Sequence, residues 1–261
     1  TEVLVGVKMD VGEPYPDGLD EGVIMVTAEL IPVASPSFEL GPPSSWATEL
    51  ARVVDRGIRE SKAIDFKKLC IKEGEKVWMI FLDIYPTNDD GNLIDASVLA
   101  ALAALKNTKL PKVEDDKVVY GELSSEKLKL NKLPITFTFG KINDKIILDP
   151  NSKEEMVLDA RLSISVYEGN IHAMQKGGDK GITLEEIEKM IDIALKKEKE
   201  IRGLLKWTLK FLQIAMGAPI LIGLKQEDLE KILYNPIAIA KLEFEKGILP
   251  ITIKRPLPVK S

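Results

Sequence analysis

One continuous stretch, KVWMIFLDIYPTNDDGNLIDASVLAALAAL, spans residues 76–105 and decides the fold. Its opening segment, residues 76–84, is rich in β-branched and aromatic side chains, which is typical of a strand. The polar segment 88–92 is dense in turn-forming residues, and the alanine-rich segment 94–105 behind it has almost no polar face. A helix that is apolar on all sides is usually buried. The stretch therefore predicts a strand and a helix that both belong to the core.

The residues on the N-terminal side of this stretch extend the pattern. The apolar segments 3–7 and 23–33 each predict a strand. A connection rich in proline and glycine follows over residues 35–43, and the spacing of apolar residues then predicts a helix over residues 45–63. The first half of the chain is thus expected to combine strands with two helices.

The second half repeats the same style. Short strands are expected over residues 135–139, 145–148, 161–166 and 170–175. The pair Glu168-Gly169 between the last two is a hairpin signal, and Thr183 with Glu186 three residues later fits a capping box that opens a helix. Strands followed by a helix, twice over, indicate the α+β class. The sequence pattern shows no βαβ alternation and no glycine-rich phosphate loop.

Composition limits the functions that the chain can have. The formal net charge is −5 and the sequence pI is about 5.3, so any contact with nucleic acid must come from a local basic patch. The single cysteine, Cys70, excludes an internal disulfide and favours a reducing, cytoplasmic location. With one histidine, His172, a histidine-based metal site is not expected, and no cofactor is predicted. The longest apolar run, residues 211–224, is too short and too interrupted to span a membrane.

Three stretches together carry a resemblance to a known family. They are SPSFELGPP at residues 35–43 with ELARVVDRGIRESKAID at 49–65, DDGNLIDASVLAALAAL at 89–105, and LDPNSKEEMVLDARLSISV at 148–166 followed by HAMQKGG at 172–178. As a set they resemble the RNase PH family, and more narrowly its non-catalytic members in the archaeal exosome. The resemblance implies an RNase PH-like fold, with two βαβ-like halves, mixed sheets and packed helices.

The resemblance covers residues 1–203 and leaves residues 204–261 as an unassigned C-terminal extension. This extension carries nine Lys/Arg against five Asp/Glu, whereas the chain as a whole is acidic. Family members begin with an arm and opening strands that have no counterpart before Thr1. We therefore expect an open sheet edge beside the first strand, which would make the chain a poor monomer.

The family resemblance also locates a degenerate phosphate site. RNase PH enzymes use phosphate to cleave the last phosphodiester of RNA, and active members cradle the phosphate with a Gly-Thr-Arg stretch at the start of the alanine-rich helix. The matching residues here are Asn92, Leu93 and Ile94. The Leu93 and Ile94 side chains can neither pair with phosphate nor donate hydrogen bonds to it, so the resemblance predicts that this site is lost.

A second element of the reaction is altered in the third stretch. Active members carry two aspartates six residues apart there, and the matching positions are Glu155 and Arg161. Glu155 keeps a carboxylate. Arg161 cannot serve as a general acid because a guanidinium does not titrate in the useful range. Loss of the phosphate cradle together with one carboxylate predicts a subunit that is not an enzyme.

One basic feature remains. Arg52, Arg56 and Arg59 are spaced i, i+4 and i+7, which places them on one face of the predicted helix. From the spacing alone, a solvated face with local ion pairs explains them better, the acidic candidates being Glu49, Asp55 and Glu60. The resemblance reverses that preference, because arginines of this helix in the family hold RNA phosphates. It implies RNA contact by Arg52 first, then Arg56 and Arg59.

The predicted function is a non-catalytic, RNA-binding and structural exosome subunit. By resemblance it alternates with a catalytic RNase PH-like exosome subunit in a hexameric ring, binds single-stranded RNA and the RNA-binding cap proteins, and contacts no membrane. Two alternatives stay open. The first is an active phosphate-dependent 3'-to-5' exoribonuclease with a replacement phosphate site from Arg56, Arg59 or Lys176. The second is a ring-assembly protein without RNA contact.

Overall fold

The structure is a computed structural model that describes residues 1–114, 117–217 and 237–241. Its helices are α1 (Ser45–Glu60), η1 (Phe66–Leu69, a 3-10 helix), α2 (Leu93–Asn107), α3 (Ser152–Glu155) and α4 (Leu184–Gly217). Its strands are β1 (Glu2–Gly12), β2 (Val23–Ala28), β3 (Cys70–Lys72), β4 (Lys76–Asn88), β5 (Lys109–Glu114), β6 (Lys117–Lys127), β7 (Ile135–Ile142), β8 (Lys145–Leu148), β9 (Ala160–Tyr167), β10 (Asn170–Gly177) and β11 (Ile237–Lys241).

The first half of the chain builds a mixed sheet in the order β11-β1-β4-β2, with β3 also paired to β4. Strands β2 and β4 run parallel, and α1 lies between them in the chain. They form a βαβ unit, so the expectation of no βαβ alternation was wrong in this half. The edge of β1 that was expected to be open pairs with β11 from Glu2 to Gly6. That pairing satisfies backbone groups that an open edge would expose.

The second half builds an antiparallel sheet in the order β10-β9-β7-β8. The predicted hairpin joins β9 to β10, and both turn residues have positive φ, 49° at Glu168 and 78° at Gly169. The capping box at the start of α4 is also confirmed. The Glu186 backbone N–H donates to the Thr183 hydroxyl, and the Thr183 N–H donates to the Glu186 carboxylate.

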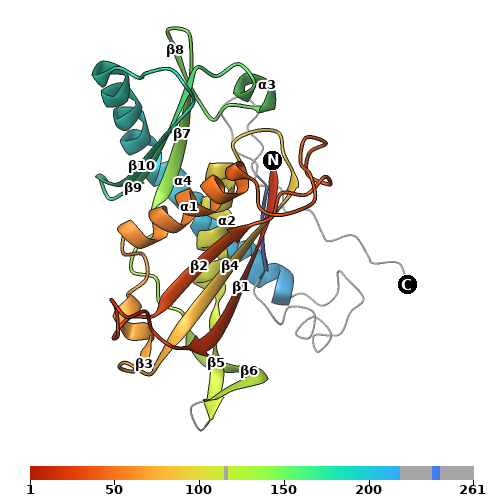
Figure 1. Ribbon diagram of the computed structural model, residues 1–261, viewed down its shortest axis with the longest axis vertical. Helices are drawn as coiled ribbons and strands as arrows, with labels where there is room; N and C mark the ends of the chain where they lie inside the picture. The colour runs from red at the N-terminus through yellow and green to blue at the C-terminus, as the bar shows by residue number, and fades with distance from the viewer. Residues whose placement is uncertain (115–116, 218–236, 242–261) are drawn as a thin grey trace.

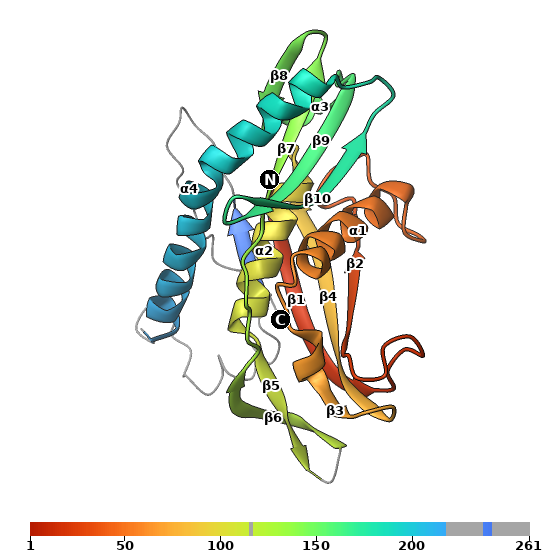
Figure 2. The same cartoon turned by 90° about the vertical axis from the view of Figure 1, so that its left-hand side faces the viewer.

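Helix α2 is the centre of the molecule. Every residue from Leu93 to Leu105 is buried, as the alanine-rich sequence predicted. The helix contacts β1 and β7 as well as α1 and α4, so both sheets pack on it. Figure 2 shows α2 between the first sheet and α4, with the second sheet above it. The two halves therefore share one core, and elements of both meet at the N-terminal end of α2.

Helix α4 continues past residue 203 without a break, and β11 comes from the segment predicted as an extension. The division of the chain at that residue stays a prediction. Among residues 1–114, 117–217 and 237–241, no helix is both long enough and apolar enough to cross a membrane.

Candidate functional site

Helix α1 presents one buried face and one open face. Its N-cap, Ser44, accepts a hydrogen bond from the Ala47 N–H at 3.2 Å, which fixes the start of the helix. Leu50, Val54 and Ile58 are fully buried, as their spacing predicted. The opposite side of the helix therefore faces away from the core and carries the three arginines.

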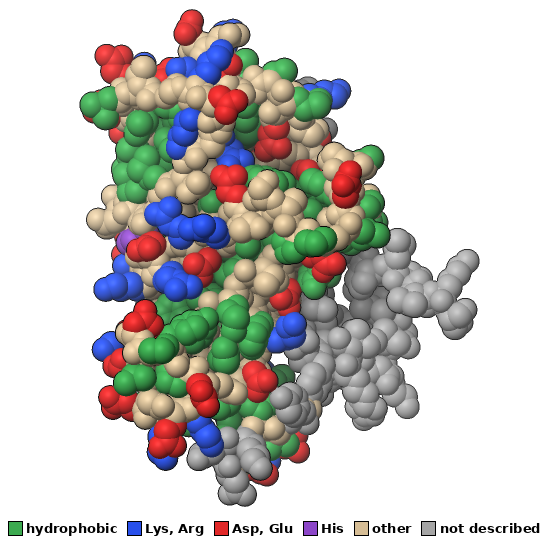
Figure 3. Space-filling model, in the orientation of Figure 1, with side chains coloured by type: hydrophobic (Ala, Val, Ile, Leu, Met, Phe, Trp, Pro, Cys, Tyr) green, Lys and Arg blue, Asp and Glu red, His purple; other side chains and the backbone are tan. Residues whose placement is uncertain are grey.

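The structure places Arg52, Arg56 and Arg59 on one exposed face of α1. Figure 3 shows Lys and Arg side chains gathered over α1 in the middle of the molecule. Arg59 pairs with Asp55 at 2.8 Å, and Arg56 donates a long hydrogen bond of 3.4 Å to the Gln175 side chain on β10. Arg52 has no hydrogen bond or ion pair with any residue that the structure describes. We call these three side chains the arginine face.

The N-terminal end of α2 holds the residues that were predicted to form a degenerate phosphate site. Asn92 is the N-cap and adopts a left-handed conformation with φ 51°. Its backbone N–H donates to the Glu155 carboxylate at 3.0 Å. Its side-chain amide donates to Asp149 at 2.6 Å and to Asp95 at 2.9 Å. The predicted phosphate residue and the predicted acid-site residue are therefore brought into direct contact.

Two backbone donors at this helix end, the N–H groups of Asn92 and Gly91, donate to carboxylates of the chain itself. Next to Asn92, the Gly91 N–H donates to Asp89 at 3.0 Å, and the Leu93 and Ile94 side chains are 2% and 1% exposed. A helix N-terminus attracts anions because its N–H groups lack partners within the helix. Here Glu155 takes the position of an external anion. Burial raises the pKa of Glu155, against the opposing effects of the Asn92 N–H and the Arg161 charge.

Asp95 ties this helix end to the second sheet. Its carboxylate accepts hydrogen bonds from the Thr138 N–H at 2.9 Å and the Thr138 hydroxyl at 2.7 Å, both on β7. Burial raises the pKa of Asp95 to about 7, although the Asn92 and Thr138 hydrogen bonds oppose the shift. These contacts hold the start of α2 against β7.

Arg161, the other residue of the predicted acid site, faces α1. Its guanidinium pairs with Glu49 at 2.5 Å and lies 4.7 Å from the centroid of the Trp46 ring. A side chain at Gly177 on β10 would approach the guanidinium to 2.8 Å, so this glycine leaves room for it. Arg161 thus joins β9 to the first turns of α1.

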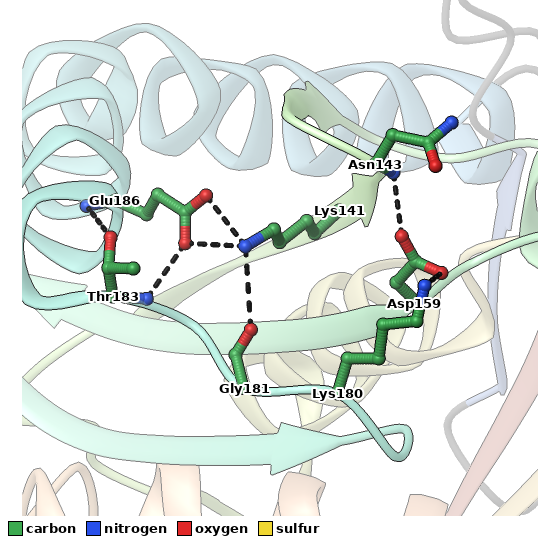
Figure 4. A network of polar contacts seen from close by, with 7 residues as sticks. All are labelled: Lys141, Asn143, Asp159, Lys180, Gly181, Thr183 and Glu186. Atoms are coloured by element: carbon green, nitrogen blue, oxygen red, sulfur yellow. Dashed lines mark hydrogen bonds and ion pairs between the residues drawn. The ribbon is translucent and has the colours of Figure 1, made fainter.

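The loop after β10 is held firmly beside these contacts. Lys141 on β7 pairs with Glu186 at 2.8 Å and donates to the Gly181 carbonyl at 3.4 Å. Lys180 pairs with Asp159 at 2.8 Å. Figure 4 shows this network between β7, the start of β9 and the start of α4. The segment 178–183 connects β10 to α4.

The carboxylates around Asn92 do not form a metal centre. Within the described part of the chain, no group of three or more His, Cys, Asp or Glu side chains is arranged to hold a metal ion. The acidic residues here accept hydrogen bonds from the chain instead, as the Asn92 and Gly91 contacts show.

Sequence reasoning missed two contacts around α1. Gln175 contacts Arg56, although the two are 119 positions apart in the sequence. Glu49 was considered as a local partner of the arginines, and it pairs instead with Arg161, 112 positions away. The spacing of residues on α1 indicates that Glu49 lies near the arginines. No local pattern indicates that its partner comes from the second sheet.

Comparison with known proteins places this architecture in a family. The chain belongs to the 3' exoribonuclease family: the model for domain 1 of that family matches residues 1–111, and the model for domain 2 matches residues 132–197. The resemblance to the RNase PH family is therefore confirmed.

Individual relatives within this family are exosome components. The exosome complex component Rrp42 of Methanothermobacter thermautotrophicus is 50% identical over 204 residues, covering 77% of this chain and 75% of the relative. A solved structure of the Archaeoglobus fulgidus exosome with RNA bound to the active site has a chain 47% identical to this one. The TM-score is 0.71, over 77% of this chain and 78% of that chain. A second structure, of an archaeal exosome core, has a TM-score of 0.68 and 44% identity, covering 78% and 76% of the two chains. These likenesses confirm the predicted fold.

Proposed function

We propose that this chain is a non-catalytic subunit of an archaeal-type exosome ring, where it binds RNA and completes the ring. The functional support is the identity of its relatives, which are exosome components of the Rrp42 type, together with the arrangement of α1 and α2. The ring partner is a catalytic RNase PH-like subunit, and cap proteins bind the same assembly. The cytoplasmic location stays a prediction.

One observation carries the non-catalytic part of this proposal. The Asn92 N–H at the start of α2 already donates to Glu155. Phosphorolysis needs a free cradle of donors for the attacking phosphate. The two neighbouring side chains, Leu93 and Ile94, are buried hydrocarbon and supply no replacement. Arg161, where active members carry a carboxylate, is engaged by Glu49 and Trp46.

The arginine face supports the RNA-binding part. Phosphate contacts depend on exposed cations, and arginine binds phosphate oxygens with two parallel N–H donors. Arg52 is exposed and has no partner among the described residues, whereas Arg56 and Arg59 already make contacts within the chain. The structure therefore supports the same order of importance that the resemblance implied, with Arg52 first.

The first prediction concerns activity. In phosphate buffer, the purified chain alone is expected to release no nucleoside diphosphate from a labelled single-stranded RNA. A mixture with the catalytic subunit is expected to release it several times faster than the catalytic subunit by itself. Phosphorolysis by this chain alone would support the alternative of an active enzyme. Equal rates with and without the chain would reject its role in the ring.

The second prediction concerns RNA binding by the assembled ring. We expect Arg52→Ala to weaken the affinity for single-stranded RNA about tenfold and to reduce the salt dependence by roughly 0.7 in the log–log slope per lost phosphate contact. Arg59→Ala is expected to have a smaller effect because Arg59 pairs with Asp55. Filter binding at several salt concentrations measures both quantities.

The matched control is Lys189→Ala, which removes an exposed cation from α4. It is expected to leave the affinity and the salt slope unchanged. If Arg52→Ala also leaves them unchanged while the ring still assembles, the chain is a ring-assembly protein without RNA contact.

A further inference from the structure

Glu49 shares the face of α1 that carries the arginines. It precedes Arg52 by three positions and Arg56 by seven, and both spacings bring residues to the same side of a helix. On an isolated helix, a carboxylate and an arginine three positions apart form an ion pair. The expected partner of Glu49 is therefore Arg52, the residue on which RNA binding most depends.

The structure shows a different pairing. Glu49 accepts from the Arg161 guanidinium at 2.5 Å, and Arg52 has no partner among the residues that the structure describes. The Arg161 side chain is 14% exposed, which makes its attraction for Glu49 less screened by water than a pair on the open helix surface. The Glu49 carboxylate therefore pairs with the Arg161 guanidinium on β9 and not with Arg52.

Arg161 is held in the orientation that this pairing needs. The Trp46 ring lies under the guanidinium at 4.7 Å, a distance at which cation and ring attract. Gly177 lies against it from β10, where any side chain would approach to 2.8 Å. Gly178, the next residue, would bring a side chain within 2.9 Å of the Asp159–Ala160 backbone. The guanidinium therefore has little freedom to turn away from Glu49.

We propose that Arg161 draws Glu49 away from the arginine face and so keeps Arg52 available for the phosphates of single-stranded RNA. Arg161 is then a positioning residue that acts through Glu49 and does not itself touch the RNA. This inference rests on the proposed RNA-binding function of α1. It assigns Arg161 a role in RNA binding, at a position where active family members carry a carboxylate.

Electrostatics explains why the pairing matters for binding. An unpaired Glu49 would either occupy Arg52 or place a negative charge about one helical turn from the bound phosphate. That separation is shorter than the screening length of about 8 Å at physiological salt. Both effects oppose RNA binding. A carboxylate at position 161 would repel Glu49 toward Arg52, so the identity of residue 161 affects the arginine face from outside α1.

The test uses the assembled ring and labelled single-stranded RNA. Arg161→Met keeps an apolar side chain against Trp46 but leaves Glu49 without its partner. We expect its RNA affinity to fall about three- to tenfold, the effect of weakening one phosphate contact. Adding Glu49→Gln to this variant removes the carboxylate, and the affinity is expected to return to within about twofold of wild type.

Three results would overturn the inference. The first is unchanged affinity in Arg161→Met. The second is reduced affinity that Glu49→Gln fails to restore, which would mean that Arg161 only supports the local fold. The third applies if the ring with Arg161→Met does not assemble. Arg161→Lys keeps a positive charge beside Glu49 and is then expected to retain wild-type affinity. Reduced RNA affinity of an intact ring with Arg161→Lys would reject the inference.

The Arg52→Ala variant separates this inference from the proposed function. If Arg52→Ala binds RNA as well as wild type, the arginine face is not an RNA-binding surface and the proposed function fails. If Arg52→Ala weakens binding but Arg161→Met does not, only the role of Arg161 is rejected.

Discussion

Replacement of Asp95 by alanine is expected to lower the free energy of unfolding by about 3 kcal/mol or more. The Asp95 carboxylate is the acceptor for the Thr138 N–H, the Thr138 hydroxyl and the Asn92 amide. Asp95 and Thr138 are both buried. Without the carboxylate, these buried donors have no acceptor and no contact with water. Each donor left unsatisfied in this way costs about 1–3 kcal/mol. Urea denaturation followed by circular dichroism measures the change.

The effect of this substitution is expected to depend on pH. Burial raises the pKa of Asp95 to about 7, whereas an aspartate in the unfolded chain has a pKa of about 3.9. The folded state therefore holds the proton more strongly. The contribution of Asp95 to stability is complete below pH ~4 and is lost as pH rises to about 7, with a slope of up to about 1.4 kcal/mol per pH unit. The deficit of Asp95→Ala should be larger at pH 5 than at pH 8.

Ser97→Ala is the matched control for this prediction. Ser97 lies two residues further along α2, is fully buried, and its hydroxyl has no hydrogen-bond partner among the described residues. Alanine has the higher helix propensity, so this variant is expected to be as stable as wild type or slightly more stable at both pH values. A deficit for Asp95→Ala that is the same at pH 5 and pH 8 would contradict the raised pKa.

The parts of the fold that the sequence predicted well are those with strong local patterns. The apolar spacing of α1 predicted its buried face, and the alanine-rich composition of α2 predicted a helix buried on all sides. The hairpin at Glu168-Gly169 and the capping box at Thr183 also follow from neighbouring residues. In each case the residues that determine the structure belong to one helix or are close neighbours in the sequence.

The missed elements lack such patterns or depend on distant partners. Strand β5 contains Pro111 and little alternation, so its pairing with β6 gave no clear signal. The βαβ unit was missed because β2 and β4 were recognised as strands without a pairing direction, and parallel pairing is set by the whole sheet. Strand β2 was predicted too long, since it ends at Ala28.

The same distinction applies to the candidate site. The arginine face could be predicted because its three residues lie on one helix. That the Glu155 carboxylate accepts a hydrogen bond from the Asn92 N–H at the start of α2 could not be predicted, because Glu155 and Asn92 are 63 positions apart. Sequence comparison suggested that the phosphate-binding residues were replaced. It could not show that an internal carboxylate occupies this helix end, because that depends on how α3 contacts the loop before α2.

The contact of α3 with the loop before α2 depends on Gly91, and Gly91→Ala is expected to destabilise the chain by about 3 kcal/mol or more. A Cβ at this position would lie 2.5 Å from the Pro150 carbonyl oxygen and 2.6 Å from the Ser152 nitrogen. These are backbone atoms that cannot move aside as a flexible side chain can. The backbone at Gly91 also has φ +90°, which an L side chain rarely adopts.

Gly74→Ala separates the two causes. Gly74 has a similar φ of +73°, but a Cβ there would meet nothing within 4 Å. Its substitution should therefore cost only the conformational strain of about 1 kcal/mol. Denaturation of both variants under the same conditions gives the difference that the steric clash contributes. Equal losses for the two would mean that the loop before α2 adjusts freely.

A second measurement links this stability effect to the site. If Gly91→Ala pushes α3 away, the Glu155 carboxylate leaves the Asn92 N–H, and that amide should exchange its hydrogen faster than in wild type. Gly74→Ala should not change this rate, because Gly74 lies in the turn between β3 and β4. Faster exchange at Asn92 in Gly91→Ala alone would show that the tight contact at Gly91 keeps the Glu155 carboxylate at the predicted degenerate phosphate site. Unchanged exchange would mean that Glu155 is held by other contacts of α3.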